Sequence, residues 1–169
     1  LPLNRAYLVF AGLESALRYL ARLRFTQEDI SYLKKQGLFS APFLEYLGNF
    51  RFRGDIWSIS EGEVFFAQEP VLRITASLIE TQVLESFLLN TVNVETMLAS
   101  KAARVTCAAC GRGVFDFSLR RTHGLDAALC AARSSFIAGF SGTSNVLAGK
   151  LYGIPVAGTM AHSFVMAFK

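Results

Sequence analysis

The chain has 169 residues, of which 52% are hydrophobic and 18% are charged. This balance excludes an intrinsically disordered chain, which has few apolar residues and a high net charge. The length suffices for one ordinary domain with a hydrophobic core and is short for a two-domain enzyme. Charged residues interrupt the N-terminal stretch, and Gly, Pro, Ser, Thr and His interrupt the apolar stretches near the C-terminus. We therefore expect neither a signal peptide nor a membrane-spanning helix.

The net charge of +4 is distributed unevenly along the chain. Residues 1–96 contain 9 basic and 11 acidic side chains, whereas residues 97–169 contain 8 basic and 2 acidic ones. An electropositive second part suits an anionic ligand, either a phosphate or carboxylate in a cleft or the backbone of a nucleic acid. A solvated basic face without a ligand explains the same pattern.

Apolar periodicity and turn residues predict the elements of the first 77 positions. Thr26 is typical of a helix N-cap, and Gly37 is typical of a helix end. From about Phe50 the apolar period changes from helical to two, which predicts strands. In chain order we expect a short buried strand (6–12), an amphipathic helix (13–25), a helix from Thr26 to Gly37, a short helix with proline in its first turn (41–50) and three or four antiparallel strands (50–77).

The second part of the chain predicts an α/β fold. Apolar residues at helical spacing run from Leu78 to near Gly111, which corresponds to one helix of roughly eight turns. A strand (113–121), a helix (124–139), a glycine-rich turn with a helix (140–153) and a strand (154–158) follow it. This order is typical of parallel strands with crossover helices, whose active sites lie at the C-terminal ends of the strands. We therefore expect an N-terminal α+β part (1–77), then a long helix leading into the first βα units of an α/β barrel or doubly wound sheet (78–169).

Two arginines, Arg120 and Arg121, end the first predicted parallel strand. A guanidinium group can bind a carboxylate or a phosphate through two parallel hydrogen bonds. Alternatively, one of the two arginines pairs with Asp116 or Asp126. We expect at least one of the arginines to be a ligand residue.

The turn from Gly139 to Asn145 is a second candidate anion site. Its glycines permit a close backbone approach, and Thr143, Ser144 and Asn145 offer hydroxyl groups, an amide and N–H groups at the start of a helix. The turn lacks the lysine and the spacing of a Walker A loop. A turn that only caps a helix has the same composition.

A single histidine, His162, follows the second predicted strand, with Gly158 and Thr159 at the strand end. Near two arginines the imidazole is expected to be neutral, which makes it a nucleophile toward phosphorus and a general base. A core histidine that is hydrogen-bonded to backbone fits the same pattern. The apolar residues that follow are expected to anchor the helix presenting the imidazole: Phe164, Val165, Met166 and Phe168.

Three cysteines lie in the second part of the chain. Cys107 and Cys110 have zinc-type spacing, and His123 with Cys130 would complete a set of four ligands. However, all three cysteines lie in helical patterns, where cysteine behaves as a small apolar residue, so we expect neither a metal site nor a redox role. Three cysteines cannot all pair, and a reducing cytoplasm is the expected compartment.

Several segments in combination resemble the nicotinate phosphoribosyltransferase family. The segments are DFSLRRTHG (116–124), GFSGTSNVLAGKLYGIPVAGTMAHSF (139–164), EPVLRITASLIETQVLESFLLNTVN (69–93) and ASKAARV (99–105). No single segment identifies the family, but the order and spacing of the segments together do. The resemblance extends along essentially the whole chain.

The resemblance implies an enzyme of NAD salvage that makes nicotinate mononucleotide and pyrophosphate from nicotinate and phosphoribosyl pyrophosphate. It also implies coupled ATP hydrolysis with Mg²⁺, transient phosphorylation of His162, a homodimer, and the type II phosphoribosyltransferase fold, an irregular α/β barrel plus an N-terminal antiparallel domain. Taken with the residue analysis, it assigns nicotinate to Gly158, Thr159 and Arg120, and phosphate or another anion to Arg121, Thr143, Ser144, Asn145 and Ser163.

Members of this family are considerably longer than 169 residues, so the chain resembles a fragment that lacks both ends. We expect the chain alone to be inactive and to leave sheet edges and apolar surface exposed. The alternatives are a phosphoribosyltransferase that uses nicotinamide or quinolinate, and a basic nucleic-acid-binding module. The second alternative lacks aromatic residues interleaved with the basic ones, so we expect no nucleic-acid partner.

Overall fold

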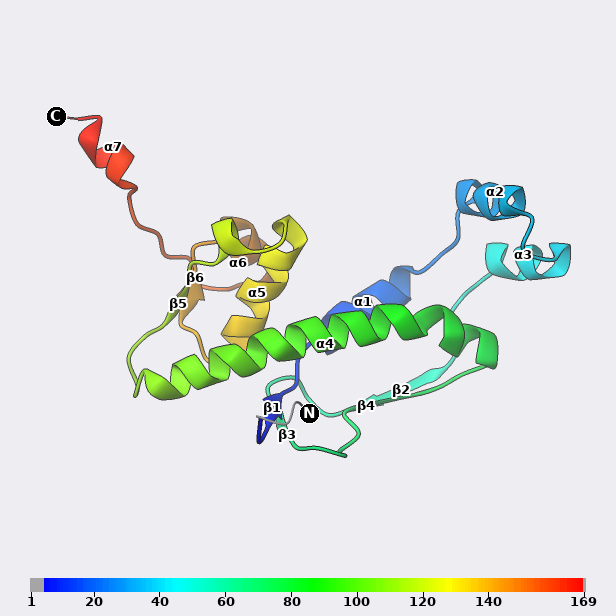
Figure 1. Ribbon diagram of the computed structural model, residues 1–169, viewed down its shortest axis with the longest axis horizontal. Coiled ribbons are helices and arrows are strands. Elements are labelled where there is room, and N and C mark those ends of the chain that lie inside the picture. Colours follow the sequence, from blue (N-terminus) through cyan, green and yellow to red (C-terminus); the bar gives the residue numbers. More distant parts are fainter. Residues whose placement is uncertain (1–4, 169) are drawn as a thin grey trace.

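The structure, a computed structural model, describes residues 5–168 and is organised around one long helix (Figure 1). This helix, α4 (Leu78–Ala108), has 31 residues and confirms the long helix predicted from Leu78. It begins with a capping box, in which Ser77 accepts a hydrogen bond from the Glu80 N–H and Glu80 accepts one from the Ser77 N–H. Helices α1 (Leu13–Arg22) and α5 (Leu125–Ile137) contact it at different points along its length.

The N-terminal helices follow the sequence prediction closely. Leu20 of α1 and Leu84 of α4 belong to one buried cluster, with Ala16 and Leu88. Thr26 caps α2 (Gln27–Gln36), and Gly37 ends it with a φ of 69°. Helix α3 (Ala41–Gly48) has proline in its first turn. Helix α2 buries none of its residues, and the α2–α3 pair projects beyond the N-terminal end of α4 (Figure 1).

The antiparallel strands form two separate pairs instead of the single patch predicted. Strand β1 (Leu8–Val9) pairs with β3 (Val64–Phe65), and β2 (Asp55–Ser58) pairs with β4 (Leu72–Thr75). The strands divide because the backbone of Phe10 exchanges hydrogen bonds with Gly62 and Glu63, which draws β3 to β1 and away from β2.

The other side of β1 is bound by hydroxyl groups of α4. Ser100 accepts a hydrogen bond from the Val9 N–H at 2.8 Å. One turn earlier, Thr96 accepts one from the Ala11 N–H at 3.3 Å and donates to the Ala11 carbonyl oxygen at 3.1 Å. Buried backbone groups need such partners, so the two hydroxyls complete the hydrogen bonding of this short strand.

Three short parallel segments follow α4 and confirm the predicted βαβ order. Strand β5 (Phe115–Asp116) pairs with β6 (Gly142–Thr143), and Val156 adds a single parallel bridge to Thr143. Helix α5 connects β5 to β6, and α6 (Val146–Tyr152) connects β6 to the bridge. The mixed α/β class is therefore confirmed.

The limits of these strands differ from the prediction. The segment predicted as a strand over 113–121 contains β5 and then a 3₁₀ turn, η1 (Leu119–Arg121). The turn predicted over 139–145 contains the central strand β6. An ideal Cβ at Gly142 would lie 2.4 Å from the Pro155 carbonyl oxygen, so this glycine is needed for the close approach of a neighbouring segment. Only Val156 of the predicted strand 154–158 makes a bridge.

The last helix, α7 (His162–Met166), projects away from α5 and α6 (Figure 1). The predicted anchoring by its apolar residues is wrong, because Phe164, Val165, Met166 and Phe168 are all exposed. Residues 157–161 have no helical or strand structure and place the helix away from the rest of the fold, where the rings of Phe164 and Phe168 contact each other. No helix among the described residues is both long and apolar enough to cross a membrane.

Candidate active site

A pocket of about 640 Å³ lies between η1 and the segment that leads into α7. Five predicted site residues line it, from three separate parts of the chain: Arg120, Ser144, Gly158, Thr159 and His162. Apolar residues that the sequence analysis did not assign complete the walls: Phe117, Leu119, Met160 and Ala161. The pocket thus combines a cation, an imidazole and hydroxyl groups with an apolar lining.

The pocket lies beyond the C-terminal ends of the parallel strands, which is where α/β folds place their active sites. Asp116, at the end of β5, accepts hydrogen bonds from the Thr143 hydroxyl at 2.8 Å and from the Ser118 N–H at 3.0 Å. The Ser144 N–H donates to the Asp116 carbonyl oxygen at 2.8 Å. Asp116 therefore fixes the ends of both strands and the start of the segment that carries Arg120.

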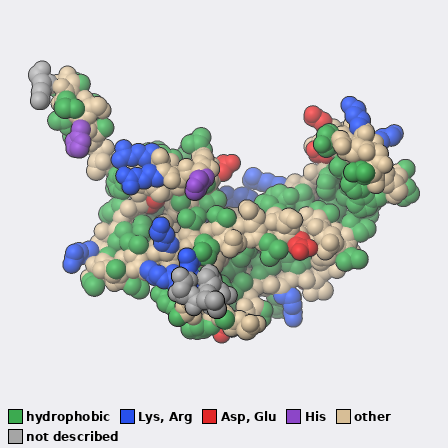
Figure 2. All heavy atoms as spheres, in the orientation of Figure 1, with side chains coloured by type: hydrophobic (Ala, Val, Ile, Leu, Met, Phe, Trp, Pro, Cys, Tyr) green, Lys and Arg blue, Asp and Glu red, His purple; other side chains and the backbone are tan. Residues whose placement is uncertain are grey.

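The structure separates the two arginines. Both are exposed, and neither forms an ion pair with a carboxylate among residues 5–168, so the alternative of pairing with Asp116 or Asp126 is wrong. Only Arg120 lines the pocket. On the face drawn in Figure 2, Lys and Arg side chains gather between the two histidines. Of the described basic residues in this part, Arg120 lines the pocket, whereas Arg133 is paired with Glu61 and Glu95.

Thr143 and Asn145 are used inside the fold. Thr143 is fully buried, and its hydroxyl accepts a hydrogen bond from the Asn145 N–H at 3.0 Å in addition to its bond with Asp116. Asn145 is buried and caps α6 by accepting a hydrogen bond from the Ala148 N–H at 3.1 Å. Of the predicted anion cradle, only Ser144 reaches the pocket. Arg121 and Ser163 are exposed outside the lining.

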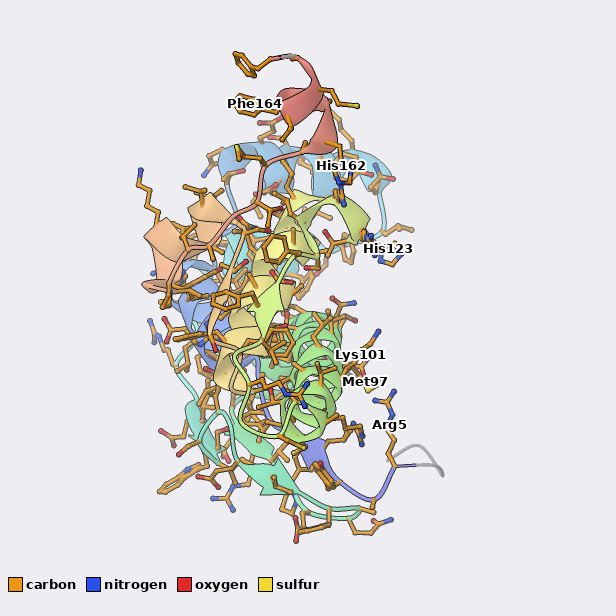
Figure 3. All side chains as sticks on the ribbon, turned by 90° about the vertical axis from the view of Figure 1, so that its left-hand side faces the viewer. Arg5, Met97, Lys101, His123, His162 and Phe164 are labelled. Atoms are coloured by element: carbon orange, nitrogen blue, oxygen red, sulfur yellow. The ribbon has the colours of Figure 1, made fainter. Side chains whose placement is uncertain are left out.

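His162 is the first residue of α7 and is exposed, so it is not the core histidine of the alternative interpretation. Figure 3 shows His162 on α7 with its ring directed back toward the segment that carries His123. An exposed imidazole on a pocket wall that also contains Arg120 can meet a phosphate group without steric obstruction from a core.

Among the residues that the structure describes, no carboxylate lines the pocket. Within residues 5–168, no three His, Cys, Asp or Glu side chains gather closely enough to hold a metal ion. The described residues therefore assign no ligand to Mg²⁺, which prefers carboxylate and phosphate oxygens.

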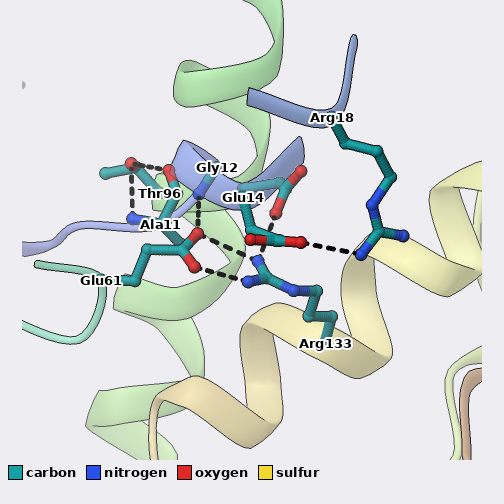
Figure 4. Close-up of polar contacts among 8 residues, drawn as sticks. Ala11, Gly12, Glu14, Arg18, Glu61, Thr96 and Arg133 are labelled. Carbon is teal, nitrogen blue, oxygen red and sulfur yellow. Dashed lines mark hydrogen bonds and ion pairs between the residues drawn. The ribbon is translucent and has the colours of Figure 1, made fainter. Parts of the chain in front are cut away.

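A partly buried charged network, missed by the sequence analysis, joins the N-terminal part to α5 (Figure 4). Arg133 donates to both oxygens of Glu61, at 3.0 Å for Nη1 to Oε1, and to Glu95 Oε2 at 3.3 Å. Glu61 also accepts a hydrogen bond from the Gly12 N–H at 2.6 Å. Because the partners are 38 and 72 positions from Arg133 in sequence, no local pattern could reveal them.

The network shifts the pKa values of its two carboxyl groups in opposite directions. Burial opposes ionisation of Glu61, but the hydrogen bond and charge of Arg133, together with the backbone N–H groups of Gly12 and Glu14, outweigh it and lower the pKa below its usual value. Burial dominates at Glu95 and raises its pKa despite the charge of Arg133, and the nearby charge of Glu61 adds to the increase.

Comparison with known proteins agrees with this geometry. The N-terminal domain of nicotinate phosphoribosyltransferase (NAPRTase) matches residues 1–93, and the NAPRTase family domain matches residues 113–169. Nicotinate phosphoribosyltransferase pncB2 of Mycobacterium tuberculosis is 51% identical over 168 residues, which are 99% of this chain and 36% of the relative. The Bacillus subtilis nicotinate phosphoribosyltransferase is 46% identical over 169 residues, covering 100% of this chain and 34% of the relative.

Solved structures have the same fold. Human nicotinic acid phosphoribosyltransferase superposes with a TM-score of 0.89 at 34% identity, over 98% of this chain and 34% of the human one. Nicotinate-nucleotide pyrophosphorylase from Pyrococcus furiosus, at 24% identity, shares the fold with a TM-score of 0.75 over 99% of this chain and 36% of its own. The chain spans about a third of the length of these relatives. The resemblance inferred from the sequence is confirmed, and the chain belongs to the nicotinate phosphoribosyltransferase family.

Proposed function

We propose that this chain forms part of an enzyme that makes nicotinate mononucleotide and pyrophosphate from nicotinate and phosphoribosyl pyrophosphate, for NAD salvage. One observation carries the proposal: a single pocket at the C-terminal ends of the parallel strands collects Arg120, Ser144, Gly158, Thr159 and His162. Membership of the family supports the choice of substrates. Both bacterial relatives are named as transferring a phosphoribosyl group to nicotinate.

The pocket offers complementary groups for the two substrates. The guanidinium of Arg120 suits the nicotinate carboxylate, because it can form two parallel hydrogen bonds. The apolar walls contributed by Phe117 and Leu119 suit the pyridine ring. Thr159 and Gly158 leave hydroxyl and backbone N–H groups beside the ring, and Ser144 offers a hydroxyl to the sugar phosphate.

The reaction needs positioning more than covalent chemistry on the substrate. The pyridine nitrogen attacks C1 of the ribosyl group while the bond between C1 and the pyrophosphate oxygen breaks. The electron pair of the broken bond leaves with the pyrophosphate. Positive charge develops at the sugar in the transition state, and the pyridine nitrogen carries it in the product. Cations near the departing phosphates and a fixed orientation of the ring lower the barrier.

We further propose that the enzyme couples this reaction to ATP hydrolysis. A ring nitrogen of His162 attacks the γ-phosphorus of ATP, ADP leaves, and water later releases the phosphoryl group from the ring. Support comes from the position of His162, exposed on the same pocket wall as Arg120. The proposal also includes a homodimer, which rests on the family resemblance, and a cytoplasmic location, which rests on three cysteines that cannot all pair. We assign no residue of this chain to Mg²⁺.

The test uses a chimaeric enzyme in which residues 1–169 replace the aligned part of the Bacillus subtilis relative. We expect it to form nicotinate mononucleotide, to prefer nicotinate over nicotinamide and quinolinate, and to take acid-labile phosphate from γ-labelled ATP. His162→Ala should lose that label, whereas His123→Ala should retain it. A folded chimaera without nicotinate mononucleotide formation would contradict the function, and label that persists in His162→Ala would contradict the phosphohistidine alone. The 169-residue chain by itself is expected to be inactive.

A further inference from the structure

The C-terminal end of α4 carries two cysteines that the proposed reaction does not use. Their place at the end of a helical pattern predicted that Cys107 and Cys110 behave as small apolar residues. In the structure both are exposed, and they lie where α4 ends and the chain turns toward β5. Cys130, by contrast, is partly buried on α5, and burial raises the pKa of its thiol. The three thiols are therefore not equivalent.

A tight turn brings Cys107 and Cys110 together. The Cys110 N–H donates a hydrogen bond to the Cys107 carbonyl oxygen at 3.2 Å. A turn closed by this bond holds the two Cα atoms less than about 7 Å apart, which overlaps the separation that a disulfide requires. The thiol of Cys110 is folded back over the same turn, because its Sγ lies 3.8 Å from the Cys107 carbonyl oxygen.

The backbone at Cys110 is in an uncommon conformation. Its φ is 50°, and Gln68 is the one other non-glycine residue with positive φ in the part of the chain that the structure describes. A residue with a Cβ pays energy for the left-handed conformation, and glycine usually takes this position at a helix end. Gly111, directly after Cys110, also has positive φ. Cys110 therefore occupies a position at the helix end where glycine would adopt the left-handed conformation at a lower cost in energy.

The charges around the turn favour an anionic reaction partner. Between Glu95 and Asp116 the chain contains no acidic residue, while Lys101, Arg104 and Arg112 are basic. Figure 3 shows Lys101 on the surface of α4. A negatively charged tripeptide disulfide of the glutathione type would thus be attracted to this end of the helix.

We propose that Cys107 and Cys110 form a redox-active dithiol that is oxidised to an intramolecular disulfide by small anionic disulfides. The thiolate of one cysteine attacks a sulfur of the small disulfide, whose S–S bond breaks and releases one small thiol. The thiolate of the other cysteine then attacks the mixed disulfide, which forms the Cys107–Cys110 bond and releases the second small thiol. Two electrons and the two thiol protons pass to the small molecule, and an excess of small thiol reverses the reaction.

The test equilibrates the 169-residue chain with mixtures of oxidised and reduced glutathione, alkylates the free thiols, and locates them by peptide mass spectrometry. We expect a disulfide between Cys107 and Cys110. Cys130 should remain a free thiol that is alkylated only after denaturation. Cys130→Ser should leave the transition unchanged. In the Cys107→Ser and Cys110→Ser variants, the reaction should stop at a persistent mixed disulfide with glutathione, because the second thiol is missing.

Comparison with the unfolded chain tests the role of the turn. In strong denaturant we expect the equilibrium constant for the internal disulfide to fall by about tenfold, because the two thiols lose their fixed separation. An unchanged constant would overturn the proposal that the fold pairs them. A disulfide that involves Cys130, or mixed disulfides that never resolve in the unsubstituted chain, would overturn it as well.

Discussion

The side chains of Asp116 and Thr143 join two neighbouring parallel strands through a hydrogen bond of 2.8 Å inside the fold. Thr143 is the donor, and its hydroxyl oxygen also accepts from the Asn145 N–H. The same carboxylate holds the Ser118 N–H at the start of the segment that leads to Arg120. One buried pair thus connects the strands to both sides of the pocket.

Thr143→Val should be destabilising although the two side chains have nearly the same shape. It leaves a buried carboxylate oxygen and the Asn145 N–H without their partner, and we expect a loss of about 2 kcal/mol in the free energy of unfolding. Thr143→Ser keeps the hydroxyl and should lose less. Urea unfolding of the three chains measures the difference, and equal stability of the valine variant would contradict the structural role.

The two adjacent arginines should differ in their effect on activity. Arg120 lines the pocket and Arg121 does not. In the chimaeric enzyme we expect Arg120→Lys to reduce kcat/KM for nicotinate by about tenfold or more, because lysine cannot form two parallel hydrogen bonds to the carboxylate. Arg121→Lys serves as the matched control and should retain most of the activity. Equal losses in both variants would show that the pocket does not distinguish them.

Glu61 and Glu95 should respond to pH with opposite signs. The pKa of Glu61 is lowered, so its stabilising contribution is present above the usual carboxyl pKa and is lost as the pH falls through the lowered value. The pKa of Glu95 is raised, so its contribution is present below the usual value and is lost as the pH rises through the raised one.

Substitution of each carboxyl group separates the two effects. At about pH 7 we expect Glu61→Gln to lose about 2 kcal/mol, since Arg133 and the Gly12 N–H keep a weaker partner, and the loss should shrink toward about pH 4. For Glu95→Gln, we expect the free energy of unfolding to increase relative to that of the parent chain as the pH rises from about 4 to about 7. Unfolding measured at several pH values tests both, and parallel pH dependences of the two variants would contradict the assigned shifts.

The two capping boxes should differ in their consequences for the whole chain. Ser77 caps α4, which contacts α1, α5 and β1, whereas Thr26 caps α2, which buries none of its residues. Ser77→Ala is expected to lower the free energy of unfolding by about 1 kcal/mol. Thr26→Ala should act within α2 alone, as faster amide exchange there with little change in overall stability. A global loss from Thr26→Ala would mean that α2 is coupled to the rest of the fold.

The sequence predicted well the features that depend on local pattern. Thr26 and Gly37 fix the ends of α2 through contacts within three or four residues, so their positions could be read from the chain. The residue motifs and the family resemblance together also identified five of the residues that line the pocket, because a motif keeps chemical groups in order even when the elements around them are misassigned.

The features that depend on contacts distant in sequence were missed. Gly142 was interpreted as a turn glycine, although it accommodates Pro155, which follows it by one helix. Thr143 was assigned to a ligand because its hydroxyl partner, Asp116, lies 27 positions away. Exposed apolar surface was expected of this chain but was not located on α7, because apolar residues at helical spacing indicate a face that can be buried without specifying what covers it.

The two hydroxyls of α4 that bind β1 also protect the chain from unwanted association. A strand as short as Leu8–Val9 usually presents an open row of N–H and C=O groups to any extended peptide. Here Thr96 and Ser100, one helical turn apart, occupy that row from one side while β3 occupies it from the other. Because both acceptors are side chains on a single rigid helix, β1 cannot recruit a strand from another molecule unless it first separates from α4.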